Sequence, residues 1–529
     1  MPIERWKPSQ STTEQEERLL ARLKRTRKLF RFLREHRREL FDDSFQAELE
    51  SMYRGSGAGK TPVVPALMAM ATLLQGYVGA SDAEAVELTM VDLRWQMVLD
   101  RLGSTTPAFS QGALHDFRRR LIAHDLDRRL LEKTRELARR TKGFDYKKVR
   151  GLRVAMDSAP LEGAGRVEDT INLLGHAARN VVRCAAELLG LSSDTVARKA
   201  GIPVLLASSI KQGLDRTWTE AGEREAAVEE LASQLQSLQR WLQSRLRDQL
   251  KKPPLKQHVE TLDQILAQDL DENGKRIRNG VAKDRRISIE DAEMRHGRKS
   301  SSKRFDGYKR HVGRDLDDGL VLACAVTPAN VPEVEATVAL NDDIEAQGEE
   351  IGELYVDRGY ISSSLVPVIL ARGGEVVCRP WRQGNGELFS KEEFTLELDA
   401  LTITCPAGQT EPIKLGSVVR FPAKVCRSCA LRPQCTTAKT KGRSVRIGDD
   451  ERLQQELREK AKTPEGRARL RERVPVEHGL AHVVYRQGRR ARYLGTRKNL
   501  YDLRRACSIQ NLEAGQLALD QADRMKAAA

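Results

Sequence analysis

Two aspartates far apart in the sequence each follow a short apolar run, and this pattern constrains the fold more than any other feature. Asp157 comes after an alternating apolar segment, residues 147–156, which includes Val154 and Met156. Asp357 comes after a second apolar segment, residues 351–356. Such runs predict β-strands, and functional side chains gather where the strands of an α/β sheet end. We therefore expect both carboxylates at the ends of strands in one sheet.

The segments around these aspartates predict a sheet in which strands alternate with helices. Turn-forming residues 314–319 separate two strand-like segments and predict a β-hairpin. Helical spacing follows at 332–347 and again at 362–372. The five expected strands are residues 147–156, 305–312, 320–326, 351–356 and 375–379. This order predicts a mixed α/β sheet.

Most of the remaining chain has helical patterning. Up to about residue 145, apolar residues recur at helical spacing in the segments 14–40, 65–78, 82–91, 93–102 and 114–140. The first segment is rich in arginine and lysine, which could face a phosphate backbone or simply be solvated. Residues 173–270 indicate a helical insertion, either a helical hairpin or an oligomerisation arm, with leucines recurring between 223 and 250.

A third acidic residue, Glu477, lies in a basic C-terminal segment. It follows Pro475, a residue well tolerated in the first turn of a helix. Carboxylates converging from separate segments would suit hard divalent cations, and two such ions can activate a nucleophile and stabilise a leaving oxygen at a phosphodiester. The plain alternatives are that the aspartates are turn formers and that Glu477, with Glu465 and Glu472 nearby, is a surface residue.

Cysteines form a second candidate metal site. Half of the eight cysteines fall between residues 405 and 435, namely Cys405, Cys426, Cys429 and Cys435. Four thiolates could hold a structural zinc ion in a tetrahedron, and four free thiols are the alternative. The other four are scattered, and we expect buried thiols there rather than disulfides.

Length and charge set wider limits. A chain of 529 residues is expected to form two to four domains, and a formal net charge of +15 suits a partner that is a polyanion. A merely basic soluble protein would have the same charge. The sequence contains no apolar run long enough to span a bilayer and no secretory pattern at its N-terminus, so we expect it in the cytoplasm, associated with the nucleoid.

Several ordered motifs resemble those of one enzyme family. They are MDS at 156–158, RFDGYKRHV at 304–312, DRGY at 357–360 and VEHGLAHVVYRQGRRARYLGTRKNL at 476–500. Together they resemble transposases of bacterial insertion sequences that have a DDE, RNase H-like catalytic domain. The segment RGSGAGKTPVVPALMAMATLLQGYVGASDAEA, starting at residue 54, resembles the helical domain found ahead of such catalytic domains.

This resemblance implies an α/β fold: an RNase H-like mixed-sheet catalytic core with an all-helical N-terminal domain, a helical insertion and a small cysteine-containing insertion. The implied ranges are a DNA-binding helical domain at 1–145, two parts of the core at 146–172 and 291–382, a mainly helical insertion at 173–290, an insertion with the candidate zinc site at 383–470, and the C-terminal catalytic helix and basic tail at 471–529.

The resemblance also implies a site. Asp157, Asp357 and Glu477 would be the catalytic carboxylates and would bind two Mg²⁺ or Mn²⁺ ions, with Asp157 bridging both. The sequence departs from a pattern of some relatives at Leu470 and Val484, where they have tyrosine and lysine, and this departure argues against a hairpin-forming cleavage route. The expected DNA-binding residues are Lys309, Arg310, Arg358, Arg489, Arg490, Arg492, Arg497 and Lys498.

The activity implied by this family is recognition of the terminal inverted repeats of an insertion sequence, followed by metal-dependent DNA strand cleavage and strand transfer. Double-stranded DNA would be the partner, and a homodimer is expected because two ends must be brought together. Two alternatives remain open at this point. One is a metal-dependent nuclease without strand transfer, and the other is a non-catalytic DNA-binding protein derived from a transposase.

Overall fold

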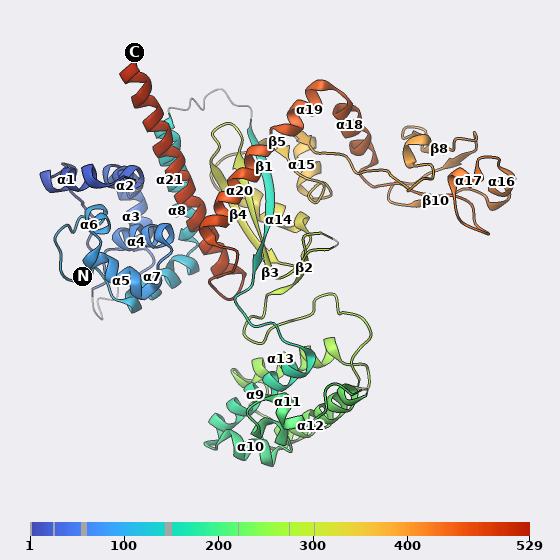
Figure 1. Ribbon diagram of the computed structural model, residues 1–529, viewed down its shortest axis with the longest axis horizontal. Coiled ribbons are helices and arrows are strands. Elements are labelled where there is room, and N and C mark those ends of the chain that lie inside the picture. Colours follow the sequence, from blue (N-terminus) through green and yellow to red (C-terminus); the bar gives the residue numbers. More distant parts are fainter. Residues whose placement is uncertain are drawn as a thin grey trace.

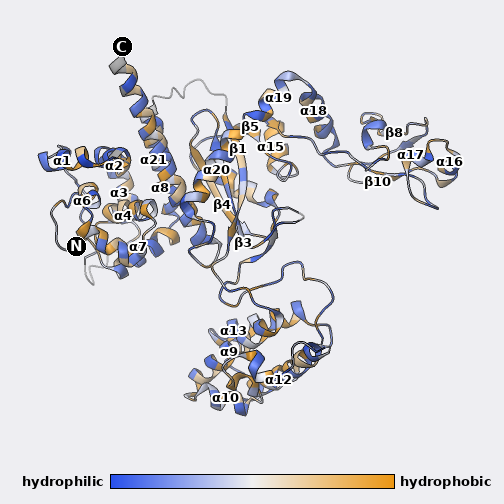
Figure 2. Cartoon of the chain, viewed as in Figure 1, coloured by the Kyte–Doolittle hydropathy of each residue, from blue (hydrophilic) through white to orange (hydrophobic). Residues whose placement is uncertain are grey.

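The computed structural model describes residues 3–24, 27–53, 61–142, 151–220, 222–274, 276–300 and 302–528 (Figure 1). The beginning of the first expected strand, residues 147–150, lies outside these ranges. Figure 2 shows hydrophobic residues along the central strands and hydrophilic residues along the outer helices α18 and α19. No helix in the described ranges combines the length and the apolar character needed to cross a membrane.

A six-stranded mixed sheet forms the centre of the molecule. Its strands are β1 (Leu152–Glu162), β2 (Arg295–Arg298), β3 (Arg304–Asp315), β4 (Val321–Pro328), β5 (Ile351–Tyr355) and β6 (Glu375–Val377). The order is β2-β3-β1-β5-β6, and β4 pairs with β3 beyond the segment that pairs with β2. β1 is antiparallel to β3 and parallel to β5, and β5 is parallel to β6. All five expected strands are present, and within this sheet only the short β2 was not predicted.

The β3–β4 hairpin forms where the turn residues predicted it. Asp315 N–H donates to the carbonyl of Leu320 at 3.0 Å, and Gly319 N–H donates to the carbonyl of Asp315 at 3.0 Å. Gly319 has a φ of +68°, which a glycine adopts without steric cost. The hairpin therefore follows from local sequence.

Helices cover both faces of the sheet, and strand alternation decides which side chain meets which helix. On β1, Val154 and Met156 share a core with α14 (Ala336–Glu345) and α15 (Leu365–Ala371). Ala155 shares another core with Tyr355 and with Val476 of α20 (Val474–Gln487). Because successive side chains of a strand point to opposite faces, Asp157 points to the α20 side of the sheet.

The N-terminal part of the chain is helical, as expected. It contains α1 (Glu14–Arg22), α2 (Arg27–Leu40), α3 (Asp43–Glu50), α4 (Pro65–Val78), α5 (Asp82–Val91), α6 (Leu93–Val98), α7 (Gln111–Ala123) and α8 (Leu126–Lys142). Segments 14–40 and 114–140 were each predicted as one helix, and each forms two. α1 ends because Leu23 has extended backbone angles. The break between α7 and α8 lies at Asp125, whose positive φ of 54° is not helical.

The helical insertion has its own hydrophobic core. It contains α9 (Thr170–Leu189), α10 (Ser193–Lys199), the 3₁₀ turn η2 (Pro203–Leu206), α11 (Ile210–Leu214), α12 (Glu223–Arg245) and α13 (Leu255–Asp269), and it hangs below the sheet in Figure 1. The recurring leucines of α12, including Leu231, Leu235 and Leu238, are buried in this core. The insertion is thus larger than a hairpin, and the leucine stripe is used within the chain.

The cysteine-containing insertion is a small β-rich module that extends away from the sheet (Figure 1). Its elements are η4 (Lys391–Glu393), β7 (Thr395–Glu397), β8 (Thr402–Thr404), β9 (Thr410–Pro412), β10 (Val418–Arg420), α16 (Ala423–Ser428), α17 (Arg432–Cys435) and β11 (Ser444–Arg446). The chain then returns through α18 (Glu451–Lys462) and α19 (Pro464–Arg471) to α20 at the sheet.

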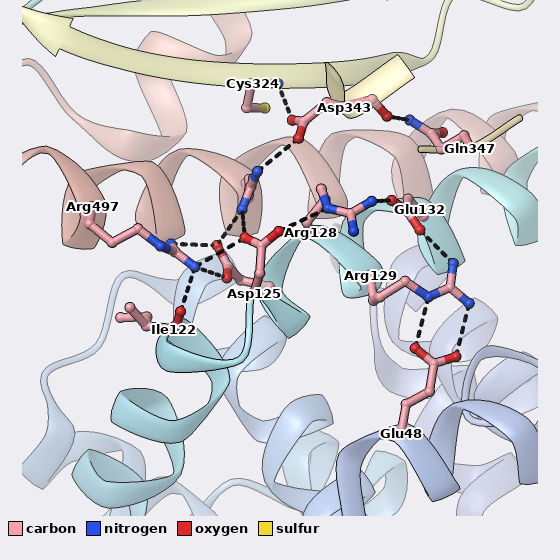
Figure 3. A network of polar contacts seen from close by, with 12 residues as sticks. Glu48, Ile122, Asp125, Arg128, Arg129, Glu132, Cys324, Asp343, Gln347 and Arg497 are labelled. Carbon is pink, nitrogen blue, oxygen red and sulfur yellow. Dashed lines mark hydrogen bonds and ion pairs between the residues drawn. The ribbon is translucent and has the colours of Figure 1, made fainter. Parts of the chain in front are cut away.

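The last helix, α21 (Thr496–Ala528), joins the N-terminal helices to the sheet. It packs along α8 and shares cores with both regions, through Tyr501 and Ile509 on one side and Leu503 and Cys507 on the other. Arg504 of α21 extends this contact through ion pairs, whose carboxylates lie in the network of Figure 3. The short η3 turn (Glu333–Glu335) precedes α14 and completes the described elements.

Candidate active site

Asp157 lies within β1, not at its end as the sequence suggested. β1 continues to Glu162 because β3 is long enough to pair with it throughout, and Asp157 faces Val312 in that register. The pairing between β1 and β5 stops earlier, at Ala155 and Tyr355. Asp157 is therefore the point where β1 passes the end of β5.

Asp357 lies two residues beyond the end of β5, in the turn formed by the DRGY motif. Its Oδ1 accepts a hydrogen bond from the Gly359 N–H at 2.9 Å, and its carbonyl accepts one from the Tyr360 N–H at 3.2 Å. These bonds fix the half-buried side chain beside the uncovered part of β1. Asp357 thus takes the strand-end position that the sequence predicted.

Glu477 lies in the first turn of α20, where Pro475 occupies one of the first helical positions as expected. Val476, next to it, is fully buried against Ala155 and Tyr355, which places this turn over the sheet. The Glu477 side chain itself is 54% exposed.

Asp357 and Glu477 both act electrostatically on Asp157, although the three carboxylates come from separate segments. The pKa of Asp157 is raised to about 6, mainly by burial, and the negative charges of Asp357 and Glu477 raise it further. The cation of Arg473 and the N–H of Ser158 act in the opposite direction. Arg473 Nη1 lies 3.6 Å from Asp157 Oδ1, and its Nη2 donates to Glu477 Oε1 at 2.8 Å.

Arg473 supplies the positive charge between two of these acids. Its Nη1 is buried and has no hydrogen-bond partner among the residues that the structure describes, because Asp157 Oδ1 is just too far away. Within the described ranges, no group of three or more His, Cys, Asp or Glu side chains has the spacing to hold a metal ion as it stands. The donor chemistry, carboxylate oxygens from three segments, is nonetheless the kind that Mg²⁺ and Mn²⁺ prefer.

A chain of hydrogen bonds that the sequence analysis missed runs beside the aspartates. Ser158 Oγ donates to Glu333 Oε1 at 2.5 Å, and Ser158 also bonds to the Tyr360 hydroxyl. The Tyr360 Oη lies 2.9 Å from His311 Nδ1, whose Nε2 lies 3.0 Å from Thr327 Oγ1. Ser158 and Tyr360 belong to the MDS and DRGY motifs, so the sequence could have indicated that they lie near the aspartates. Glu333 lies in no motif, and only the folded chain places it here.

Comparisons with known proteins agree with these motifs. Residues 18–120 match a family model described as a transposase domain (DUF772), and residues 404–514 match one described as a transposase DDE domain. The chain is a DDE transposase of an insertion sequence. The second match contains Glu477 and the four clustered cysteines. No curated protein and no solved structure matches the chain.

The basic residues predicted from β3 do not all reach the surface of the transposase. Arg310 is fully buried, and its guanidinium donates to the carbonyls of Pro160 and Gly488 and to Gln487 Oε1. Burial lowers its pKa to about 10. The alternation of β3 explains this placement: the side chain points into the packed interior, so Arg310 has a structural position here rather than the expected DNA-facing one. Lys309 is half-buried and donates to the carbonyl of Val331 at 2.9 Å.

The other predicted DNA-binding residues differ in exposure. Arg358 is half-buried and donates to the carbonyl of Pro380 at 2.7 Å. Arg497 forms ion pairs with Asp125 and Asp127, and Figure 3 shows it beside Asp125. The side chains of Arg489, Arg490, Arg492 and Lys498 are exposed. The exposed basic surface of the transposase tail is therefore smaller than its sequence suggests.

The four clustered cysteines of the transposase lie near one another. Cys405, Cys426, Cys429 and Cys435 line one pocket, and none of them forms a disulfide. Burial raises the pKa of the Cys435 thiol, Arg443 opposes this, and the other three thiols raise it further. The CxxC pair, Cys426 and Cys429, and the two flanking cysteines, Cys405 and Cys435, therefore lie around the same pocket of the module.

Proposed function

We propose that this transposase binds the terminal inverted repeats of its insertion sequence and catalyses metal-dependent DNA strand cleavage and strand transfer. Asp157, Asp357 and Glu477 would be its catalytic carboxylates. The observation that carries the proposal is that Arg473 contacts both Asp157 and Glu477, and the negative charges of Asp357 and Glu477 act on Asp157 as well.

The arrangement of the sheet supports an RNase H-like core. Three antiparallel strands, β1, β3 and β4, are followed by the parallel strands β5 and β6, with α14 and α15 as connections. This is the order on which the expectation was based. It brings the first aspartate onto the central strand and the second beyond its parallel neighbour.

The carboxylates fit two divalent cations in charge and in donor type. Asp157 would contact both ions, and Asp357 and Glu477 would each contact one. When bound, such ions supply activation of the attacking oxygen and stabilisation of the leaving 3′ oxygen. The raised pKa of Asp157 fits this role, since a cation would replace Arg473 as the charge that keeps this carboxylate ionised.

The reaction would proceed in two stages at this site. Water would first attack the phosphorus at the end of the element and release a 3′ hydroxyl group. That hydroxyl would then attack a phosphodiester of the target DNA, so that a new P–O bond joins the element end to the target and the broken P–O bond releases a 3′ hydroxyl group on the target strand. The exposed residues Arg489, Arg490, Arg492 and Lys498, with Lys309 and Arg358 nearer the sheet, would contact phosphates and orient the DNA. Two chains would act together, because two ends must be joined.

The test compares Asp157→Asn, Asp357→Asn and Glu477→Gln with Glu465→Gln, an exposed acid of α19. Each of the first three should slow Mg²⁺-dependent cleavage of DNA carrying the element ends by at least about a hundredfold, the scale on which preorganised charged groups act. DNA affinity should stay nearly unchanged, and Glu465→Gln should cleave like the unaltered chain. Normal cleavage by Asp157→Asn would overturn the proposal.

The nuclease alternative differs in its products. With a supercoiled plasmid as target, a transposase yields DNA in which the element ends are joined to the plasmid, whereas a nuclease yields only cut ends. Joined product that disappears in Asp357→Asn would support strand transfer by this site.

We also propose that the cysteine module holds one structural zinc ion through Cys405, Cys426, Cys429 and Cys435. Four sulfur ligands would leave no open position, so the ion would stabilise the module rather than take part in chemistry. The gathering of the four thiols around one pocket supports this proposal.

A further inference from the structure

Glu333 approaches the candidate active site from the loop between β4 and α14. It is half-buried at the start of η3, twenty-four residues before Asp357 in the sequence. Lys309 fixes this loop by donating to the carbonyl of Val331. The position is therefore held by the sheet and is not set by the loop alone.

The two oxygens of Glu333 have different surroundings. Oε1 accepts a hydrogen bond from Ser158 Oγ at 2.5 Å, which ties the carboxylate to the residue next to Asp157. Oε2 points toward Gly359. A Cβ atom added to Gly359 would lie 2.2 Å from Glu333 Oε2 and 3.1 Å from Asp357 Oδ1.

This geometry explains the glycine of the DRGY turn. Gly359 is not among the residues with positive φ, so its backbone does not require a glycine. Space requires it, because an added Cβ atom would collide with Glu333 Oε2, while Asp357 Oδ1 accepts the Gly359 N–H on the same residue. Glu333 Oε2 and Asp357 Oδ1 therefore both approach Gly359, which leaves room for them by having no side chain.

The two neighbouring acids lack a compensating cation. Within the described ranges, neither Glu333 nor Asp357 forms an ion pair, whereas Asp127 and Glu353 each pair with arginines. Like charges on nearby carboxylates disfavour each other, and a cation between them relieves this. A divalent cation bound through oxygen would supply that charge.

We propose that Glu333 is a fourth acidic residue of the active site and binds a divalent cation beside Asp357. The inference rests on the proposed function and deepens it. Glu333 approaches from the α14 side of the sheet, where it contacts Ser158, while Asp157 and Glu477 both contact Arg473 on the α20 side. The metal-binding set is then larger than the three carboxylates of the motif, and Ser158 orients the added one.

The experiment measures Mn²⁺ binding to the full chain without DNA, by the loss of the free-ion electron paramagnetic resonance signal. Glu333→Gln keeps the shape of the side chain and can still accept from Ser158. Its matched control is Glu335→Gln, an exposed acid two residues further on. Removing one ligand should weaken Mn²⁺ binding and slow Mg²⁺-dependent cleavage by about tenfold or more, while the control stays within about twofold.

Asp157→Asn is measured in parallel to separate the two proposals. If Asp157→Asn loses cleavage but Glu333→Gln binds Mn²⁺ and cleaves like the control, the inference about Glu333 is wrong and the proposed function stands. If Asp157→Asn cleaves normally, the proposed function itself fails. Gly359→Ala provides an independent check, because the added methyl group should displace Glu333 and weaken Mn²⁺ binding without removing a charge.

Discussion

At the scale of single residues, the position of Asp157 follows from strand alternation. Ala155 is buried against α20, so the side chain two residues later must point to the same side of the sheet. The next residue, Ser158, points to the other side and meets Glu333. The adjacent residues Asp157 and Ser158 therefore point to opposite faces of the sheet.

His311 shows how burial at this site should affect stability. It is fully buried between the Tyr360 hydroxyl and Thr327 Oγ1, and burial lowers its pKa from 6.5 to about 3, with Lys309 adding to the effect. The folded chain keeps it neutral while the unfolded chain takes up a proton below about pH 6.5. The stability contributed by the neutral imidazole is thus present above pH 6.5 and lost as the pH falls toward 3.

We expect His311→Gln to remove this dependence. Between pH 7.5 and pH 5, the His311 contribution should reduce the free energy of unfolding of the unaltered chain by about 2 kcal/mol, from roughly 1.4 kcal/mol per pH unit. Thermal midpoints measured at the two pH values should therefore shift less for His311→Gln than for the unaltered chain. His115→Gln, at an exposed histidine of α7, should shift like the unaltered chain. Equal shifts in all three proteins would contradict the expectation.

At the scale of elements, the predictions succeeded where local chemistry sets the boundary. α4 begins at Pro65 and ends at Val78, just before Gly79 with its φ of 78°, and α5 begins after Ser81 with a capping box to Glu84. Both helices have the predicted bounds. The sequence could not show that β1 continues past Asp157, because that depends on pairing with β3, about 150 residues later.

In the candidate site, too, some residues could be predicted from local sequence and others could not. Asp157, Asp357 and Glu477 carry local signals, an apolar run or a helix start, and the folded chain places Asp357 and Glu477 near enough to Asp157 to act on it electrostatically. Arg310 and Glu333 do not, since a basic strand residue can face either side and an acid in a loop has no pattern of its own. Their placement depends on contacts between distant segments, with Gln487 in one case and Ser158 in the other.

The prediction at the scale of elements concerns zinc binding by the cysteine module. Purified transposase should contain about one zinc ion per chain, and Cys429→Ser should lose most of it, because a structural site needs all four ligands. The loss should also make residues 383–450 more sensitive to protease than the rest of the chain, since the module has only a small core of its own. Ser428→Ala, at an exposed neighbour, is the control for both measurements. Zinc-free transposase with an equally resistant module would refute the assignment.

At the scale of the whole molecule, α21 holds the N-terminal helices against the sheet. Arg504 lies at the centre of this contact, with only 5% of its side chain exposed. Its Nη1 lies 2.6 Å from Asp125 Oδ1 and 3.2 Å from Asp127 Oδ2, and its Nη2 lies 2.9 Å from Asp343 Oδ1. Asp343 belongs to α14, while the other two acids belong to the N-terminal region. A single guanidinium therefore links both parts.

Arg504→Met should weaken this link strongly. Removing one partner of a buried ion pair leaves uncompensated buried charges and costs about 3–5 kcal/mol of stability. Arg497→Met is the matched control, because Arg497 pairs with the same Asp125 and Asp127 but its side chain is 37% exposed, and exposed pairs contribute only about 0–1 kcal/mol. Differential scanning calorimetry should show Arg504→Met unfolding at a lower temperature and in separate transitions for the two regions. A single unshifted transition would mean that apolar packing of α21 alone couples them, and the ion network would then serve only to satisfy buried charge.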